Sequence, residues 1–376
     1  MKKKTITFIS VIMLIALAIF FGCASDSDDD SSSSTASSDT SVTYKGPGSI
    51  WTLDVSGDSF TLTEEEDTSV LVTAEGSYTK TTTGFASLTV SSSSGTNALD
   101  AGDKAIGVDI PGIAFLLKPM SDNSPVITFV KYGECPSENV EANWVKTKSN
   151  SRDASLGNGD ADSSYGSPDA WAGQFNFDVS SSVATIPVSW SITNTSGDEF
   201  PVFFDTSETL GTGLCDKGIL EISEASGTTR LFMTENGGAI VDITGTQSVI
   251  GFNKQTISTA EEIDGDYIGF VFFGAQGKVY PLSATSTNGT MVVDALSDDT
   301  ESISQSAVGT VNNYQINTPA NGFVKVTLDD SVSRPMVCNF NSSIGSSNKK
   351  ILFCVTQDTD QGSTSYKHFN VLLVSK

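Results

Sequence analysis

Residues 51–63 read WTLDVSGDSFTLT, two runs of alternating apolar and polar residues on either side of a Gly-Asp turn. In Trp51–Val55 the apolar side chains share one face, which is the pattern of a strand with one buried side. The runs VSWSI at 188–192 and VKVTL at 324–328 repeat this pattern. Clusters of Gly, Asn and Asp separate such runs at roughly the 8–12-residue spacing of antiparallel barrels and sandwiches. The sequence therefore predicts an all-β protein, with one helical turn at 261–264.

Three segments begin alike, each with an aromatic strand, a turn and a second strand: 51–63, 171–188 and 267–282. They divide the chain into units of about 100 residues, each long enough for roughly seven or eight short strands. We therefore expect three consecutive β-domains, each an antiparallel barrel or sandwich. Their expected bounds are 44–148, 170–262 and 263–376, and one larger β-domain over 170–376 is the open alternative.

Two segments are poor in residues that can pack. Residues 24–42 read ASDSDDDSSSSTASSDTSV, so we expect 23–43 to form a flexible tether. Residues 149–167 read SNSRDASLGNGDADSSYGS and are rich in turn formers. We therefore expect 149–169 to be an interdomain linker.

In outline the units resemble lipocalin-like up-and-down barrels, which often open with a Gly-x-Trp strand. The segment Gly48-Ser49-Ile50-Trp51 departs from that spacing by one residue. The resemblance implies a barrel interior that holds a small apolar ligand, and it assigns no individual residue.

The N-terminus has the layout of a signal peptide. Lys2, Lys3 and Lys4 precede an apolar run that ends at Phe21. The run is shorter than the roughly 20 residues of a spanning helix, and aspartates rather than basic stop-transfer residues follow it. We therefore expect residues 1–22 to be removed on export.

Residues Phe20-Phe21-Gly22-Cys23 resemble the lipobox of bacterial lipoproteins. The resemblance implies that Cys23 carries diacylglycerol, which would attach the protein to a membrane through its N-terminal lipid. In that family an Ala such as Ala24 after the cysteine implies sorting to the outer membrane. The expected location is the cell envelope; an ordinary secreted protein is the alternative.

The charge balance excludes one class of partner. Lys plus Arg number 21 against 45 Asp plus Glu, which gives a formal net charge of −24. A chain this acidic is repelled by the phosphates of nucleic acids and by bare anionic bilayers. We expect no nucleic-acid partner, and the sequence identifies neither a protein nor a glycan partner.

Four cysteines remain if Cys23 carries lipid, and disulfides persist outside the cytosol. A hairpin centred on Ser346 sets Cys338 opposite Cys354, close enough for a disulfide. The same register sets Phe340 opposite Leu352. Reduced core cysteines are the alternative for this pair.

A second cysteine pair is less determined by the sequence. Cys135 and Cys215 both lie in turn-like contexts, and a bond between them would bridge the first two units across the linker.

Few residues point to catalysis or to metal binding. The single histidine, His368, has no neighbouring motif, and we assign no catalytic residue. The linker offers oxygen ligands at alternate positions, the requirement of a calcium loop, at Asn158, Asp160, Asp162 and Asp169. A solvated linker without calcium is the favoured alternative, and no other cofactor is expected.

Trp144 and Trp171 flank the linker, either as an aromatic platform for a sugar or, the favoured alternative, as packing residues.

Three functions are compatible with these features. The sequence favours a non-catalytic adhesion, scaffold or envelope-interaction module. The alternative is a lipocalin-like carrier of a small apolar ligand, for which an enclosed apolar cavity is the deciding observation. A glycan-acting enzyme is third.

Overall fold

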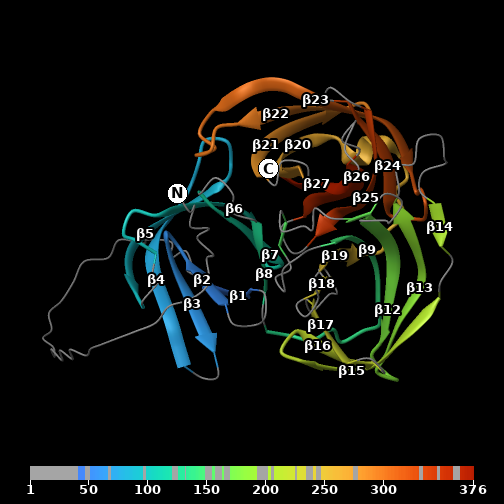
Figure 1. Cartoon of the computed structure of the whole chain (residues 1–376), viewed down its shortest axis with the longest axis horizontal. Coiled ribbons are helices and arrows are strands. Elements are labelled where there is room, and N and C mark those ends of the chain that lie inside the picture. The colour runs from blue at the N-terminus through green and yellow to red at the C-terminus, as the bar shows by residue number, and fades with distance from the viewer. Residues whose placement is uncertain are drawn as a thin grey trace, which may run out of the picture.

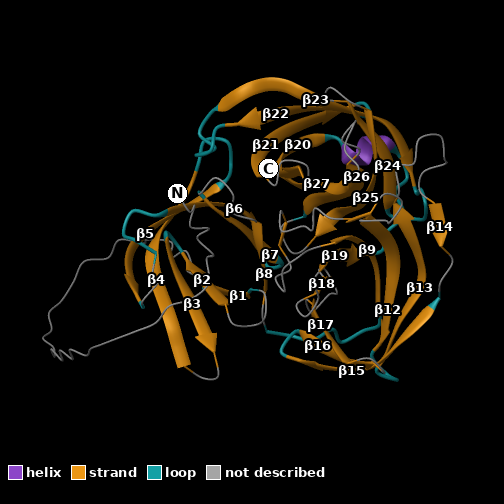
Figure 2. Ribbon diagram, viewed as in Figure 1, coloured by secondary structure: helices purple, strands orange, loops and turns teal. Residues whose placement is uncertain are grey.

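Alternating apolar and polar residues form β-strands along most of the described chain (Figure 2). The structure is a computed structural model. It describes residues 41–46, 51–66, 69–95, 99–120, 126–131, 133–148, 155–156, 163–164, 170–192, 202–204, 207–224, 227–233, 240–242, 247–273, 278–329, 333–344, 348–358 and 365–376. The all-β prediction is confirmed. Within these residues one helical turn is present, the 3-10 turn η2 (Ala260–Ile263), where the sequence predicted it.

The first sheet has the strand order β1-β2-β3-β4-β5-β6-β7-β8-β10. Its strands are β1 (Val42–Lys45), β2 (Trp51–Ser56), β3 (Ser59–Glu66), β4 (Ser69–Lys80), β5 (Ala86–Ser94), β6 (Lys104–Ile110), β7 (Ala114–Pro119), β8 (Val126–Lys131) and β10 (Ser155–Leu156). Strand β1 also pairs with β8, through Tyr44 opposite Lys131 and Lys45 opposite Val130. This short pairing closes β1 to β8 into an up-and-down barrel.

The second sheet has the order β12-β9-β19-β18-β17-β16-β15-β13-β14. Its strands are β9 (Val140–Lys148), β12 (Ala170–Asp178), β13 (Val183–Ile192), β14 (Val202–Phe204), β15 (Glu208–Asp216), β16 (Ile219–Glu224), β17 (Gly227–Met233), β18 (Ile240–Asp242) and β19 (Gln247–Asn253). The hairpin pairing of β12 with β13 completes a second barrel.

The third sheet has the order β11-β27-β20-β21-β22-β23-β24-β25-β26. Its strands are β11 (Ser163–Ser164), β20 (Gly265–Phe273), β21 (Lys278–Thr287), β22 (Thr290–Leu296), β23 (Ile303–Ile316), β24 (Phe323–Asp329), β25 (Ser333–Ile344), β26 (Lys349–Asp358) and β27 (Ser365–Ser375). Strands β26 and β27 pair along eight residue pairs, and β27 also pairs with β20, which closes the third barrel. The three barrels meet around β7, β8, β9, β26 and β27 (Figure 1).

The first boundary between sheets differs from the expected boundary between units. We expected residues 140–148 in the first unit, but β9 pairs with β12 and β19 of the second sheet. Its inward side chains, Ala142 and Trp144 among them, belong to the second barrel's core. The second barrel needs this strand to join β12 to β19. The Ser- and Asp-rich segment 149–169 therefore connects two strands of one barrel.

The described parts of that segment pair with the other two barrels. Ser155 and Leu156 form β10 beside β8 of the first sheet. Ser163 and Ser164 form β11 beside β27 of the third sheet. The segment thus adds a short edge to both barrels.

The barrels are joined by apolar side chains on their outer faces, which we call the inter-barrel core. The first sheet contributes Ile106, Val108, Leu116 and Val130; the second contributes Val145, Ala172, Trp190 and Phe252; the third contributes Phe270, Phe323, Phe353 and Leu372, with further residues of the same kind. Aromatic rings meet edge to face between barrels, Phe85 with Phe270 at 5.5 Å and Trp190 with Phe323 at 5.6 Å between centroids. Such pairs stabilise beyond their buried area.

Buried amides fix the second and third barrels relative to each other. Asn339 Nδ2 donates to the carbonyl oxygen of Asn143 at 2.6 Å, and Asn143 Nδ2 donates to the carbonyl oxygen of Asn321 at 2.7 Å. Both Asn143 and Asn339 are fully buried. Because an unpaired buried amide is costly, these bonds favour one relative position of the two barrels.

Both disulfides that the sequence suggested are present. Cys338 lies opposite Cys354 and Phe340 opposite Leu352, the register expected for the β25–β26 hairpin. Cys135 lies between β8 and β9 and is bonded to Cys215 in β15. The second bond therefore fastens the connection between the first two barrels to the wall of the second.

We predict that Phe353→Ala strongly destabilises the whole protein, because Phe353 is fully buried in the inter-barrel core. The expected loss in the free energy of unfolding is about 3–5 kcal/mol, from lost burial and the cavity left behind. Urea unfolding measures it. The matched control is Val292→Ala at a side chain that is 40% exposed, for which a change within about 0.5 kcal/mol is expected. Equal effects of the two changes would contradict a stabilising inter-barrel core.

Candidate functional site

The walls of the third barrel have two apolar faces. In β26, Phe353 and Val355 point outward into the inter-barrel core, whereas Leu352 and Cys354 point inward. Successive side chains of a strand lie on opposite faces, so a continuous apolar run supplies both cores. The outward residues fix the position of the wall, and the inward residues line the barrel's interior.

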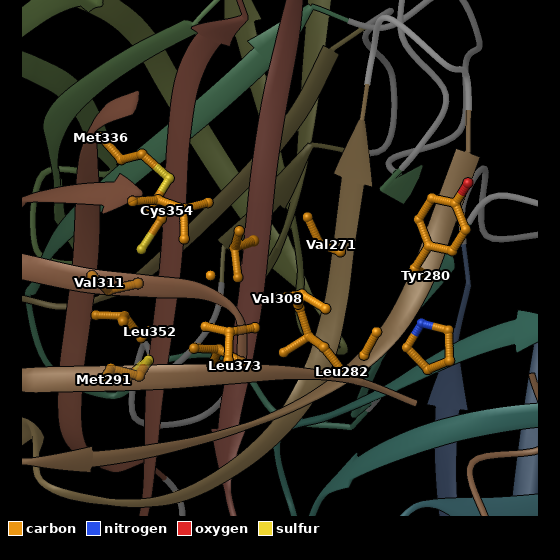
Figure 3. Close-up of a pocket in the computed structure, with 16 residues that line it drawn as sticks. Val271, Tyr280, Leu282, Met291, Val308, Val311, Met336, Leu352, Cys354 and Leu373 are labelled. Atoms are coloured by element: carbon orange, nitrogen blue, oxygen red, sulfur yellow. The ribbon is translucent and has the colours of Figure 1, made fainter. Parts of the chain in front are cut away.

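The interior of this barrel contains an apolar cavity of ≈ 250 Å³. All eight strands from β20 to β27 contribute to its lining (Figure 3). The lining residues are Val271, Tyr280, Pro281, Leu282, Met291, Val293, Ala295, Val308, Gly309, Val311, Leu328, Met336, Leu352, Cys354, Val371 and Leu373. None of these side chains is charged at neutral pH, so the lining suits an uncharged, mainly apolar occupant.

One end of the barrel core is filled by the segment that enters from the second barrel. Ile257, just before η2, and Ile263, the last residue of η2, are almost completely buried in the core of the third barrel. Asn317 holds this segment by accepting from the Ile257 N–H at 3.1 Å and donating to the Ile257 carbonyl at 2.6 Å. This segment, residues 257–263, therefore closes the end of the third barrel at which β20 begins.

Two tyrosines, Tyr267 and Tyr314, pack in the core of the third barrel at this closed end. The Tyr267 hydroxyl donates to the carbonyl oxygen of Ile263 at 2.5 Å, and its ring is fully buried. Burial raises the pKa of Tyr267 above its ordinary value and raises the pKa of Tyr314 to about 12. Both hydroxyls therefore stay neutral over the ordinary pH range, and this end of the barrel adds no phenolate charge.

The rim of the cavity includes less buried residues. Tyr280, Ala295 and Val308 are only partly buried, whereas Met291 and Leu352 are at most 1% exposed. The pairing of β21 with β22 begins at Leu282 of β21. Residues 278–281, which precede it in β21, are not paired with β22. The more exposed lining residues thus gather where the sheet is less continuous.

The side chains that line the cavity have fewer dispersion partners on the cavity side than side chains in a closely packed interior have.

A partly buried carboxyl group, that of Asp109, lies inside the first barrel, and the sequence analysis did not single it out. The Tyr44 hydroxyl donates to Asp109 Oδ1 at 3.2 Å. Burial raises the pKa of Asp109, and burial together with this carboxylate raises the pKa of Tyr44. Burial also raises the pKa of nearby Tyr78 to about 12. Asp109 follows Val108 in β6, where apolar and polar residues alternate. This alternation does not predict the hydrogen bond between Asp109 and Tyr44.

The structure brings only some of the sequence-predicted site residues to the cavity. Cys354 lines it, and its disulfide partner Cys338 belongs to the same core. His368 lies in β27 opposite Gln357. Cys23 and the calcium candidates Asn158, Asp160, Asp162 and Asp169 lie outside the described residues. Among the described residues no cluster of three or more His, Cys, Asp or Glu side chains is placed to hold a metal ion.

The two tryptophans beside the expected linker pack in the second barrel. Trp144 is 7% exposed, and its ring lies so close to Gly173 that a Cβ there would be 2.3 Å from Trp144 Cζ2. Trp171 packs against the same cluster, with Lys146 Nζ 5.2 Å from its ring centroid. The packing alternative describes both residues, and they do not form an open platform.

No protein-family model matches the chain, and no curated protein sequence matches it. The solved structures to which the chain is similar include two of mutants of the vaccine antigen transferrin binding protein B from Haemophilus parasuis. The double mutant has a TM-score of 0.26 and 9% identity over 87% of this chain and 66% of that chain. The single mutant has a TM-score of 0.25 and 10% identity over 89% and 67%. The chain thus spans about two thirds of their length, and similarity this weak says nothing about function.

Four of the protein's eight tyrosines should resist titration in the folded state. For Tyr78 and Tyr314 we expect midpoints near pH 12, and for Tyr44 and Tyr267 higher ones. The phenolate absorbance at pH 11 should therefore be lower in the native protein than in urea. Since the folded state holds these protons longer than the unfolded state, stability should fall as pH rises from about 10 towards 12. Equal native and unfolded titration curves would contradict the burial of these rings.

Proposed function

We propose that this protein is a non-catalytic carrier in the bacterial cell envelope, which holds a small apolar ligand inside its third barrel. The observation that carries the proposal is the apolar cavity of ≈ 250 Å³ within a closed eight-stranded wall. A ligand there would restore the contacts that the lining side chains lack. An adhesion or scaffold role, which the sequence favoured, assigns no role to this cavity.

The lining supports binding rather than chemistry. Its side chains are hydrocarbon or sulfur-containing, apart from the hydroxyl of Tyr280 at the rim. Acid–base or nucleophilic catalysis requires a positioned ionisable or nucleophilic group beside the substrate. Sulfur in the lining comes from thioethers and from the disulfide-bonded Cys354, which has no thiolate.

The volume limits the size of the ligand. An apolar cavity of about 150 Å³ is known to hold benzene, so by proportion ≈ 250 Å³ holds about ten non-hydrogen atoms. Pockets for drug-sized ligands are larger, about 300–1,000 Å³. A two-ring hydrocarbon such as naphthalene is therefore a suitable probe.

We predict that Val293→Phe lowers the affinity for naphthalene at least tenfold, because Val293 lines the cavity and a phenyl ring would fill part of it. The matched control is Val292→Phe, one residue earlier in β22 and 40% exposed, which should bind as the wild type does. Headspace gas chromatography over the purified protein measures naphthalene binding directly.

Ala295→Phe, at the partly buried rim of the same strand, gives a second test if Val293→Phe fails to fold. Absence of naphthalene binding by the wild type, or undiminished binding by folded Val293→Phe and Ala295→Phe, would overturn the carrier function.

The envelope location rests on the N-terminal sequence. The described residues contain no helix with the length and hydropathy to cross a membrane. We expect radiolabelled palmitate to label the wild-type protein in bacteria and not Cys23→Ala, because Cys23 occupies the lipid-bearing position of the lipobox. Immunoprecipitation followed by autoradiography reads the label. Label of equal strength on Cys23→Ala would contradict lipid attachment at this residue.

A further inference from the structure

Three sulfur-bearing residues line the cavity, two of them from the neighbouring strands β25 and β26 and one from β22 on the opposite part of the barrel wall. Met291 from β22, Met336 from β25 and Cys354 from β26 all line it. Cys354 is bonded to Cys338, so the disulfide belongs to the β25–β26 part of the wall. In Figure 3, Met336 and Cys354 lie close together at the upper left, Met291 lies below them beyond Val311 and Leu352, and Val271, Leu282 and Tyr280 lie on the right.

The register of β25 and β26 explains how Met336 comes to lie beside the disulfide. Cys338 lies directly opposite Cys354, and Met336 precedes Cys338 by two residues on the same face of β25. Met336 is therefore a diagonal neighbour of Cys354 across the strand pair. All four sulfur-bearing residues are at most 2% exposed.

The remainder of the wall is aliphatic. Val271 lies opposite Val371, and Leu282 opposite Ala295, in the paired strands around the cavity. The lining aromatic ring is that of Tyr280, which stands at the partly exposed rim. The polarisable surface in the buried part of the cavity is thus provided by sulfur.

Methionine is scarce elsewhere in this chain. Of its six methionines, Met1 and Met13 lie in the expected signal peptide. Two of the four others, Met291 and Met336, line the cavity. Leucine has a similar volume and would suit a wall whose only role is to be apolar.

Sulfur distinguishes between ligands of equal size and polarity. Thioether sulfur makes favourable contacts with aromatic rings, often at the ring edge, and a saturated ring offers no such partner. On the basis of the proposed carrier function, we infer that the natural ligand is an uncharged aromatic compound of about ten non-hydrogen atoms. Its ring would lie against Met291, Met336 and the Cys338–Cys354 disulfide.

The test compares naphthalene with decalin, its saturated counterpart with the same ten carbon atoms. The readout is the ratio of the affinity for naphthalene to the affinity for decalin. The two free probes differ in hydration, but this difference is the same for every variant and cancels when the ratios of two variants are compared. Met291→Leu and Met336→Leu change the sulfur and nearly keep the volume. Each should reduce the preference for naphthalene over decalin about twofold to tenfold.

Met233→Leu is the matched control, since Met233 is fully buried in the core of the second barrel, away from the cavity. It should leave both affinities unchanged. Headspace gas chromatography measures both hydrocarbons over the purified full-length protein. Because Met291→Leu and Met336→Leu are measured separately, the test stays decisive if one of them misfolds.

The outcomes separate the two proposals. If both probes bind and folded Met291→Leu and Met336→Leu keep the wild-type ratio, the aromatic preference is overturned and the carrier function stands. If neither probe binds to the wild type, the carrier function itself is overturned. A reduced ratio in these two variants, but not in Met233→Leu, supports the aromatic ligand.

Discussion

The structure depends on barrel walls that are apolar on both faces. An isolated up-and-down barrel buries its inner face and exposes a polar outer face, whereas here the outer faces of all three barrels also meet in one apolar core. In β26 this requires a run without polar interruption, Ile351–Val355, every residue of which is buried. The barrels therefore support one another's shape, and a cavity inside one of them is tolerated because its wall is held from outside.

Polar groups within this apolar junction determine how the barrels fit together. Apolar contacts are non-directional and allow one barrel to slide over another. The buried amides of Asn143 and Asn339 permit few such positions, since each displaced bond would leave a buried polar group unpaired. The connection through η2 adds to this, because Ile257 and Ile263 are part of the third barrel's own core. Specific hydrogen bonds thus set the geometry that apolar burial stabilises.

Several elements could be predicted from residue patterns because they depend on neighbours close in the chain. The alternation in Trp51–Val55 predicted β2, and the hairpin register predicted that Cys338 faces Cys354. The placement of β9 could not be predicted in this way. After β9 the composition changes to a segment with few residues that can pack. Such a segment can connect two strands of one barrel as well as two separate barrels. Which sheet a strand joins depends on partners more than twenty residues away, here β12 and β19.

By itself the sequence determined the all-β class, the hairpins and the disulfide between neighbouring strands, because period-two alternation and turn residues act locally. It also identified the N-terminal segment on which the expected lipid anchor rests. Only the tertiary structure decided that the third barrel encloses a cavity and that Met291, Met336 and Cys354 line it. The physical reason is that a cavity is a volume left over after side chains from eight strands have packed. No single strand contains the information on whether its inward residues meet others or face a gap.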